Sequence, residues 1–405
     1  MKVLVIGGGG REHALAWKLA QSPLCDKVYA APGNPGIAEV AECITPASPG
    51  LAGFLEIAEE KDVDLTVVGP EAPLVAGIAD AFRAKGRRII GPSAAAAQLE
   101  GSKAYAKQFM KEAGIPTAEF VVVDSVEEVP QAVRKFGYPV VLKADGLAAG
   151  KGVIIVREQK ELEPAMERLP RGRVVVEECL TGEEVSFIVL SDGVRVIPFE
   201  TTQDHKPVYD NDEGPNTGGM GAYCDTRILD EVQRKQIMET IIQPVIDNMR
   251  RRGEPFTGFL YAGLMMTDDG PKVLEFNVRM GDPECQPLMH RMASDLLATL
   301  AEGAPIEWKP EPSVCVVMAA QGYPGTPRKG DVITGIEECG AVVFQAGTKR
   351  VDGRLVTNGG RVLGVTSSGP DLKSAIENTY AAVRKIHFEG AHYRTDIGKK
   401  GLKRW

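Results

Sequence analysis

Short apolar runs alternate with amphipathic segments over the first ~100 residues, a pattern of buried strands and covering helices. The runs predicted to be strands are Val3–Ile6, Lys27–Ala31, Leu65–Val68 and Arg88–Ile90. The segments predicted to be helices are Arg11–Gln21, Leu51–Glu60 and Ile78–Lys85. This alternation predicts a doubly wound parallel sheet, whose ligands bind beyond the carboxyl ends of the strands.

The pattern changes after Ser102, where a predicted helix, Lys103–Ala113, leads into a region of mixed elements. The strands predicted for a small α+β lobe, at about residues 120–190, are Phe120–Val123, Pro139–Lys143, Gly152–Val156 and Val174–Glu178. Two hairpins and a long helix follow: Glu183–Leu190 with Arg195–Phe199, Phe259–Met266 with Pro271–Phe276, and Asp230–Arg252. The turns Ser191-Asp192-Gly193 and Asp268-Asp269-Gly270 are typical of antiparallel hairpins.

A segment rich in proline and glycine, Gly303–Pro312, is typical of a linker. The strands predicted after it are Val314–Ala319, Val332–Ile336, Ala341–Ala346, Arg354–Thr357 and Arg361–Thr366, and a helix is predicted around Asp371–Ile386. We therefore expect an α/β and α+β multidomain protein with a Rossmann-like N-terminal domain over residues 1–102, a two-lobed region over 103–305 and a small β-rich domain over 313–405.

Composition narrows the function classes. The chain has 405 residues and a net charge of −8, so no general basic field favours nucleic acid or an anionic membrane. No apolar run approaches the ~20 residues that span a bilayer, and the N-terminal run is too short for a signal peptide. The 7 cysteines form no CxxC pair. We expect a cytoplasmic protein without nucleic-acid or membrane partners.

The strand Lys272–Asn277 carries the most informative polar pattern. Glu275 and Asn277 are two residues apart and so point to the same face. Carboxylate and amide oxygens suit Mg²⁺, and Arg279, at the next same-face position, could neutralise a phosphate. An acidic turn at Asp282 and Glu284 follows. The pattern predicts phosphoryl chemistry; the alternative is a half-buried strand with a solvated acidic turn.

The N-terminal glycines do not make a dinucleotide site. A GxGxxG fingerprint needs a third glycine, but Glu12 stands there, and the second strand ends without the acidic residue that binds ribose. A nicotinamide cofactor is therefore disfavoured. The loop still leads into a helix N-terminus that suits a phosphate, although a tight turn without ligand is the alternative.

Three further loops indicate a nucleotide and a second substrate. Lys143–Val153 differs from a Walker A loop in its spacing and in Gly152, but it could close over phosphates with Lys143 and Lys151 supplying charge; the alternative is a solvated hairpin. The bend after Val174–Glu178 could pair with an adenine edge. The glycine-rich segment Gly214–Ala222 is too long for a plain connection, and His205 before it could act as acid or base, although a lone histidine more often only hydrogen-bonds.

Three strings in a fixed order carry a family resemblance: QDHK at Gln203–Lys206, GPNTGGMGAY at Gly214–Tyr223 and GDPE at Gly281–Glu284. With them, nearly the whole chain resembles the phosphoribosylamine–glycine ligase family of the ATP-grasp superfamily. The resemblance implies ATP-dependent ligation of glycine to 5-phosphoribosylamine through glycyl phosphate, in de novo purine synthesis. It implies ATP and Mg²⁺ or Mn²⁺ as cofactors, and we expect a monomer.

The resemblance also implies roles for individual residues. Those implied in catalysis are Arg279, Asp282 and Lys143. Those implied in ATP binding are Lys103, Lys143, Glu177, Glu178, Leu180 and Glu184. Those implied in substrate binding are Gly9, Gly10, Glu71, Asp204, Gly219, Lys349 and Arg361. The metal ligands implied are Glu275 and Asn277.

The chain departs from the family pattern in one stretch and at three single positions, Met280, Cys285 and Cys224. Pro164–Arg173 is short and lacks a glycine-containing insertion that the family usually has before the strand Val174–Glu178. The alternatives to this reaction are a related ATP-grasp ligase or carboxylase with another acceptor, an oxidoreductase and a non-catalytic nucleotide-binding protein. The broken fingerprint argues against the oxidoreductase, and the presence of Glu275, Asn277 and Arg279 argues against the non-catalytic protein.

Overall fold

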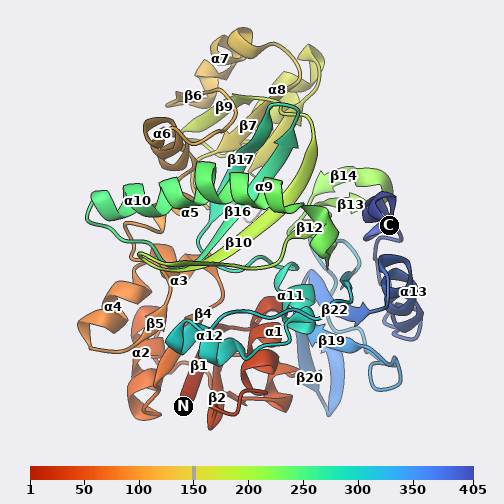
Figure 1. The fold of residues 1–405 in the computed structure, drawn as a ribbon. Helices are drawn as coiled ribbons and strands as arrows, with labels where there is room; N and C mark the ends of the chain where they lie inside the picture. Colours follow the sequence, from red (N-terminus) through yellow and green to blue (C-terminus); the bar gives the residue numbers. More distant parts are fainter. Residues whose placement is uncertain (148–151) are drawn as a thin grey trace.

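The computed structural model describes residues 1–147 and 152–405. Its N-terminal region is a five-stranded parallel sheet in the order β3-β2-β1-β4-β5 (Figure 1). The strands are β1 Lys2–Gly7, β2 Lys27–Pro32, β3 Glu42–Cys43, β4 Leu65–Val68 and β5 Ile89–Ile90, with helices α1 Gly10–Leu19, α2 Leu51–Glu60, α3 Glu71–Val75 and α4 Ile78–Ala84. The predicted doubly wound parallel sheet is confirmed.

A small lobe with its own sheet and core stands at the top of Figure 1. Its antiparallel sheet has the order β6-β9-β7-β8. The elements are β6 Phe120–Val123, α7 Val129–Phe136, β7 Val140–Ala144, β8 Val153–Val156, α8 Leu162–Arg168 and β9 Val174–Glu178. Helices α5 Gln98–Gly101 and α6 Lys103–Ala113 connect it to the N-terminal region. The small α+β lobe expected from the sequence is present.

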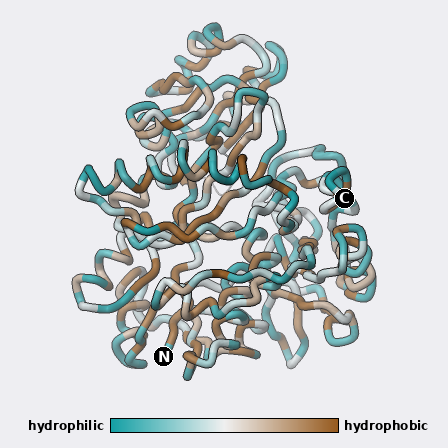
Figure 2. The backbone as a smooth tube through the Cα atoms, viewed as in Figure 1, coloured by the Kyte–Doolittle hydropathy of each residue, from teal (hydrophilic) through white to brown (hydrophobic). Residues whose placement is uncertain are grey.

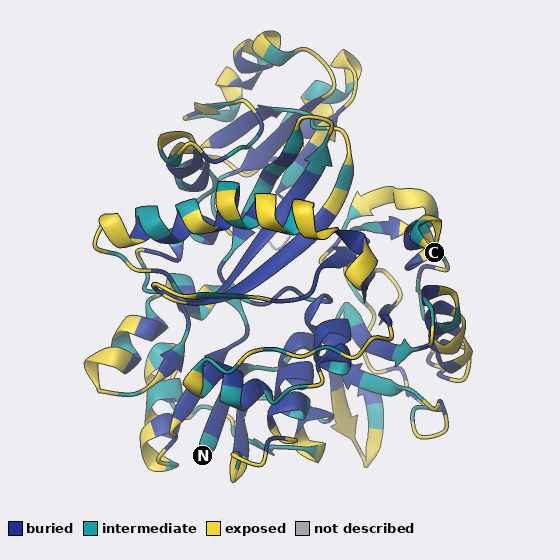
Figure 3. Ribbon diagram, in the orientation of Figure 1, coloured by how far each residue is buried: buried dark blue, intermediate teal, exposed yellow. Residues whose placement is uncertain are grey.

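One nine-stranded sheet runs through the rest of the chain in the order β17-β16-β10-β12-β15-β18-β22-β19, with β11 on the edge of β10. Its strands are β10 Glu183–Asp192, β11 Val196–Pro198, β12 Thr202–Asp204, β15 Gly221–Cys224, β16 Thr257–Thr267, β17 Gly270–Asn277, β18 Ser313–Ala319, β19 Val342–Gln345 and β22 Arg361–Ser368. Figure 2 shows apolar residues along its central strands, and Figure 3 shows the same strands buried. Antiparallel pairing of β15 with β18 joins the central region to the C-terminal one.

The remaining elements surround this sheet. They are β13 Pro207–Tyr209, β14 Glu213–Asn216, α9 Glu231–Ile237, α10 Gln243–Arg251, α11 Cys285–Arg291, α12 Leu296–Glu302, β20 Thr348–Val351, β21 Arg354–Thr357 and α13 Leu372–Val383. The described part of the chain contains no helix that is both long and apolar enough to cross a membrane.

Two predicted elements differ in the structure. The long helix Asp230–Arg252 is interrupted by a π-helical turn, Met238–Ile242, which ends two residues before Pro244. Proline has no N–H for the helical ladder and its ring crowds the preceding turn, which explains the wider turn at this point. The predicted strand Val332–Ile336 is wrong: this segment makes only isolated bridges, and Gly335, at φ +84°, breaks the extended backbone.

Candidate active site

A cleft of about 550 Å³ separates the small lobe from the large sheet and reaches the C-terminal region. One end is apolar. Its walls are formed by Met110, Val141, Val153, Ile155, Leu180, Met265 and Leu274. The other end is polar and includes Asp204, Asp282, Glu284, Tyr323 and Arg361. A ligand with a flat apolar base at one end and a charged group at the other could therefore lie lengthwise in this cleft.

A β-bulge in β17 aims the two metal-ligand candidates into this cleft. Gly263 of β16 pairs with Glu275, but its neighbour Leu264 pairs with Val273, so Leu274 is an extra residue in β17. Val273 and Phe276 consequently face the core, while Glu275 and Asn277 line the cleft. A regular strand would place Glu275 on the buried face of Val273. The same-face prediction for the pair holds because the bulge precedes both residues.

Cations surround the Glu275 carboxylate. Lys206 Nζ lies 3.7 Å from Glu275 Oε1 and 3.3 Å from Glu184 Oε2. Burial alone would raise the pKa of Glu275, but Lys206, Lys143 and Lys103 hold that pKa below its ordinary value. Glu275 is therefore ionised at neutral pH and lies in a field that suits an anionic ligand. Lys206 ends the QDHK string, but the sequence analysis gave it no role of its own, because its two partners come from distant strands.

Arg279 is held on several sides by acceptors. Its Nη2 donates to Asn277 Oδ1 at 3.0 Å and lies 2.9 Å from Glu100 Oε1, while its Nε donates to Glu71 Oε2 at 3.3 Å. Glu100 also accepts from the Val278 N–H at 2.7 Å. The structure thus brings the predicted residues Arg279, Glu71 and Asn277 together. In this arrangement Arg279 orients the amide oxygen of Asn277, and the direct phosphate contact expected for it remains a prediction.

The residues predicted to bind ATP line the apolar half of the cleft. They differ in how far their side chains are already held by other residues. Glu184 is half-exposed, and its ionic partner at 3.3 Å is Lys206. Lys103 Nζ donates to Gly146 O at 2.9 Å, and burial lowers its pKa. Glu178 accepts from the Glu119 N–H at the rim. Glu177 is the least free of these residues, because its carboxylate is buried between Lys107 and Lys143.

Arg361 of β22 joins the C-terminal region to the polar end of the cleft. Its Nη1 donates to Gly218 O and to Asp282 O, each at 2.6 Å, and its Nη2 lies 3.0 Å from Asp282 Oδ2. Gln286 Nε2 donates to the other carboxylate oxygen of Asp282 at 2.9 Å. Burial would raise the pKa of Asp282, but Arg361 holds it below its ordinary value, so this carboxylate is charged.

Two further carboxylates, Asp204 and Glu284, line the same end of the cleft as Asp282. Burial and the neighbouring Glu284 raise the pKa of Asp204 well above its usual range. Glu284 accepts from Ser186 Oγ at 3.0 Å, and Ser186 Oγ lies 2.9 Å from the Tyr261 hydroxyl. Asp282 and Asp204 therefore differ in protonation tendency: the first stays ionised, while the second binds a proton readily. Two such carboxylates can orient an ammonium and accept its proton.

Gly219 allows the glycine-rich segment Gly214–Ala222 to pack against Pro283 and Asp204. At φ +114°, a Cβ added at Gly219 would overlap Pro283 Cδ and lie 2.8 Å from Asp204 Oδ1. We expect Gly219→Ala to lower the free energy of unfolding by about 1–3 kcal/mol and to reduce turnover, because the rigid proline ring cannot move aside. Chemical denaturation and steady-state assays measure both effects. Gly253→Ala is the control, since Gly253 has φ +78° but open space around it; equal effects at both positions would contradict the crowding argument.

Other predicted residues lie elsewhere. The Gly9 N–H, at the start of α1, donates to Glu12 Oε2 at 2.5 Å, and a Cβ at Gly10 would meet Gln286 Nε2, so this loop lies beside the Asp282 turn. Lys349 is exposed on β20 and lines neither of the two cavities described in this section. Their substrate contacts remain predictions. Lys151 lies outside the described residues.

His205 does not line the cleft. It is buried, its Nε2 accepts from the Gly398 N–H at 3.4 Å, and its Nδ1 lies 3.2 Å from Gly221 O. Burial lowers its pKa well below the usual range. Since Nδ1 must donate to the carbonyl, His205 is a neutral side chain that fixes the loop, and the hydrogen-bonding alternative is the correct one.

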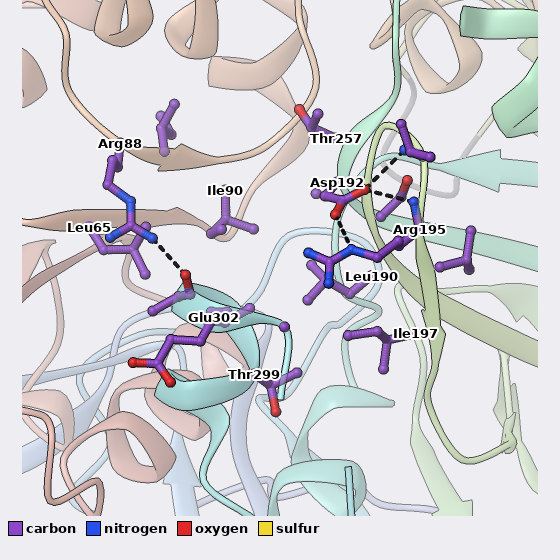
Figure 4. Close-up of a pocket in the computed structure, with 18 of the residues that line it drawn as sticks. Leu65, Arg88, Ile90, Leu190, Asp192, Arg195, Ile197, Thr257, Thr299 and Glu302 are labelled. Atoms are coloured by element: carbon purple, nitrogen blue, oxygen red, sulfur yellow. Dashed lines mark hydrogen bonds and ion pairs between the residues drawn. The ribbon is translucent and has the colours of Figure 1, made fainter. Parts of the chain in front are cut away.

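A larger cavity, of about 920 Å³, lies between β5, the β10–β11 hairpin and α12 (Figure 4). Several of its charged groups are already held within the protein. Arg195 Nε donates to Asp192 Oδ2 at 2.8 Å, and Arg88 Nη2 donates to Ala301 O at 2.9 Å. Leu190, Ile90 and Ile197 contribute apolar surface. The grouping of a carboxylate–amide pair, lysines and an arginine on one wall is found in the smaller cleft, which we take as the chemical site.

Comparisons with known proteins point to one family over the three regions of the chain. Models of the phosphoribosylglycinamide synthetase family match the chain in three parts: the N domain at residues 1–100, the ATP-grasp (A) domain at 101–285 and the C domain at 313–400. Phosphoribosylamine–glycine ligase of Ralstonia nicotianae is 50% identical over 100% of both chains. The crystal structure of phosphoribosylamine–glycine ligase from Thermotoga maritima has a TM-score of 0.87 at 36% identity, covering 98% of this chain and 100% of that one.

More distant structures share the fold alone. The biotin carboxylase domain of Hydrogenobacter thermophilus 2-oxoglutarate carboxylase has a TM-score of 0.71 at 20% identity, covering 96% of this chain and 91% of that one.

Proposed function

The chain belongs to the phosphoribosylglycinamide synthetase family, and on that premise we propose how its residues ligate glycine to 5-phosphoribosylamine. It is an ATP-dependent ligase of purine synthesis that forms a C–N bond. The observation that carries the proposal is the cleft itself: an apolar half, a cationic middle around Glu275 and a carboxylate end at Asp204 and Asp282.

In the first step a glycine carboxylate oxygen attacks the γ-phosphorus of ATP. The bond from that phosphorus to the bridging oxygen breaks, and ADP leaves, so the products are glycyl phosphate and ADP. Negative charge spreads over the transferring oxygens, and fixed cations stabilise it. We assign this role to Lys103 and Lys143, with Arg279 behind Asn277. Glu184 is the candidate for the ribose hydroxyls, and the backbone from Glu178 to Leu180 for the adenine edge.

A divalent metal fits the donors of this wall. Members of the ATP-grasp superfamily use ATP with a divalent metal, and we propose Glu275 and Asn277 as its ligands here. Within the described residues no group of three or more His, Cys, Asp or Glu side chains could hold a metal on its own. Two protein oxygens facing a phosphate site suit Mg²⁺ or Mn²⁺, which usually share their coordination with phosphates. When bound, such an ion would neutralise charge on the β- and γ-phosphates.

In the second step the amine of 5-phosphoribosylamine attacks the acyl carbon of glycyl phosphate. The bond from that carbon to the phosphate oxygen breaks, phosphate leaves, and the nitrogen loses a proton as the amide forms. Asp282, which stays charged, is suited to orient an ammonium group, and Asp204, with its raised pKa, is suited to accept a proton. The candidates for the ribose phosphate are Gly9, Gly10, Arg361 and Lys349.

One assay separates this reaction from that of another ATP-grasp ligase. We expect sustained phosphate release from ATP to require both glycine and 5-phosphoribosylamine, because each step consumes one of them. Continuous phosphate detection with each substrate omitted in turn measures this. Turnover that persists without glycine would point to a different acceptor and would remove the proposal.

Three sequence expectations remain predictions: the monomeric state, the cytoplasmic location and the identity of the metal. Light scattering of the purified chain measures the first. Fractionation of the source cells measures the second. Activity titrations with Mg²⁺ and Mn²⁺ after chelation compare the two ions.

A further inference from the structure

Three charged side chains meet in the wall of the nucleotide cleft, and we name them the Lys107–Glu177–Lys143 cluster. They come from α6, β9 and β7, and they are 2%, 1% and 4% exposed. Lys143 Nζ contacts Glu177 Oε1, and Lys107 Nζ contacts Glu177 Oε2. Each carboxylate oxygen is therefore in ionic contact with a different ammonium group.

The cluster carries one more positive than negative charge. Burial lowers the pKa of Lys107 to about 8, although Glu177 opposes the shift. Glu275 offsets part of this surplus, but it also faces Lys103 and Lys206. A buried cation that is not fully paired is destabilising unless a further anion approaches it. All three residues line the cleft in which we place ATP, so the phosphates of the nucleotide are the anion that this surplus fits.

Hydrogen bonds also tie the cluster to the metal-ligand strand. Lys143 Nζ donates to Leu274 O at 2.9 Å. Lys107 Nζ donates to Thr117 Oγ1 at 2.7 Å, and Thr117 Oγ1 donates to Val273 O at 2.6 Å. An ammonium group has three N–H donors, and Glu177 and Leu274 use two of those on Lys143. The third is thereby left for the cleft.

We propose that Lys107 is a positioning residue for ATP: it neutralises Glu177, so that Lys143 keeps its charge and one N–H for a phosphate oxygen. Without Lys107, Glu177 would have Lys143 as its one remaining ammonium partner in the cluster and would draw that charge away from the nucleotide. This inference rests on the proposed function only for the binding of ATP, not for the identity of the acceptor.

Binding of two ligands tests the inference on the full chain. We expect Lys107→Met to weaken ATP binding by about tenfold, the effect of one lost charge-assisted interaction, and to leave adenosine binding unchanged. In steady-state assays the KM for ATP should rise while the KM for glycine stays constant. Lys107→Arg should restore most of the affinity. Lys111→Met is the matched control, because Lys111 is exposed one turn further along α6.

An equal loss for adenosine and ATP would show a merely structural role, and unchanged ATP binding would show no role; either result overturns the inference. If Lys107→Met does not fold, Lys107→Gln combined with Glu177→Gln replaces the Lys107–Glu177 ion pair with two neutral amides. The double variant has no carboxylate left to engage Lys143, so it should bind ATP more tightly than the single variant Lys107→Gln, which keeps Glu177. Tighter ATP binding by the single variant would also overturn the inference. A glycine-independent ATPase activity would contradict the proposed reaction but leave these binding results standing.

Discussion

Replacing Glu275 by alanine should abolish turnover with the fold intact, with a fall in kcat of about 10³-fold or more. The carboxylate is the one charged member of the proposed metal pair, and it balances the charges of Lys206, Lys143 and Lys103. Its loss removes the metal ligand and leaves these cations to repel one another. Metal-dependent ADP formation measures the effect, and circular dichroism with thermal unfolding checks the fold.

The control for this change lies on the exposed turn before the same strand. Asp269→Ala removes a carboxylate from that turn and should leave turnover unchanged. Glu275→Gln keeps the shape of the side chain without its charge and should be nearly as inactive as the alanine variant. Activity of Glu275→Ala comparable to that of the unaltered chain would remove Glu275 from the metal site.

Arg361→Met should lower kcat/KM by about 10²-fold and destabilise the fold by about 3 kcal/mol. Arg361 is the ionic partner of the partly buried Asp282 carboxylate and holds Gly218 and Asp282 through their carbonyl oxygens. Its removal leaves a partly buried charge without this partner at the polar end of the cleft. Steady-state kinetics with each substrate varied, together with denaturant unfolding, measure the two effects.

Arg361→Lys distinguishes the two roles considered for this residue. A lysine keeps the positive charge but cannot bond both carbonyls and the carboxylate from one planar group. If the geometry around Asp282 is what matters, Arg361→Lys should be nearly as impaired as Arg361→Met. If Arg361 serves mainly as a charge for the ribose phosphate, lysine should restore most of the activity. Arg354→Met, at the exposed first residue of β21, is the control and should change neither quantity.

Periodicity predicted the elements well where each one is regular and local. The strands of the N-terminal sheet and the small lobe follow runs of apolar residues, and α6 covers the predicted range Lys103–Ala113. The predictions failed at two places where a single residue changes the backbone: Pro244 widens the long helix and Gly335 breaks a strand. In β17 the strand prediction was correct, but the extra residue Leu274 shifts its face. Alternation alone would have put Val273 and Glu275 on one face, so the correct aim of Glu275 depends on a feature that the pattern does not show.

The candidate site was predicted where a motif carries its own chemistry and was missed where partners come from distant segments. Glu275, Asn277 and Asp282 could be chosen from one short stretch. Lys107 and Lys206 could not, since their meaning comes from Glu177, Glu184 and Glu275 on other elements. Glu177 was predicted to bind ATP; its carboxylate pairs with two lysines, and a contact between this residue and ATP remains a prediction. Pairings between segments far apart in the chain follow from the fold, and a single sequence gives no local signal for them.

The pairing of β15 with β18 limits how this enzyme can be divided. Gly221–Cys224 of β15 bonds β12 on one side and β18 on the other, and all four residues are buried. A fragment that ends before Ser313 would present β15 as a bare sheet edge, and such edges recruit strands from other molecules. The nucleotide-binding half should therefore aggregate when expressed alone. The small lobe has its own sheet and core and is the natural piece to exchange between relatives.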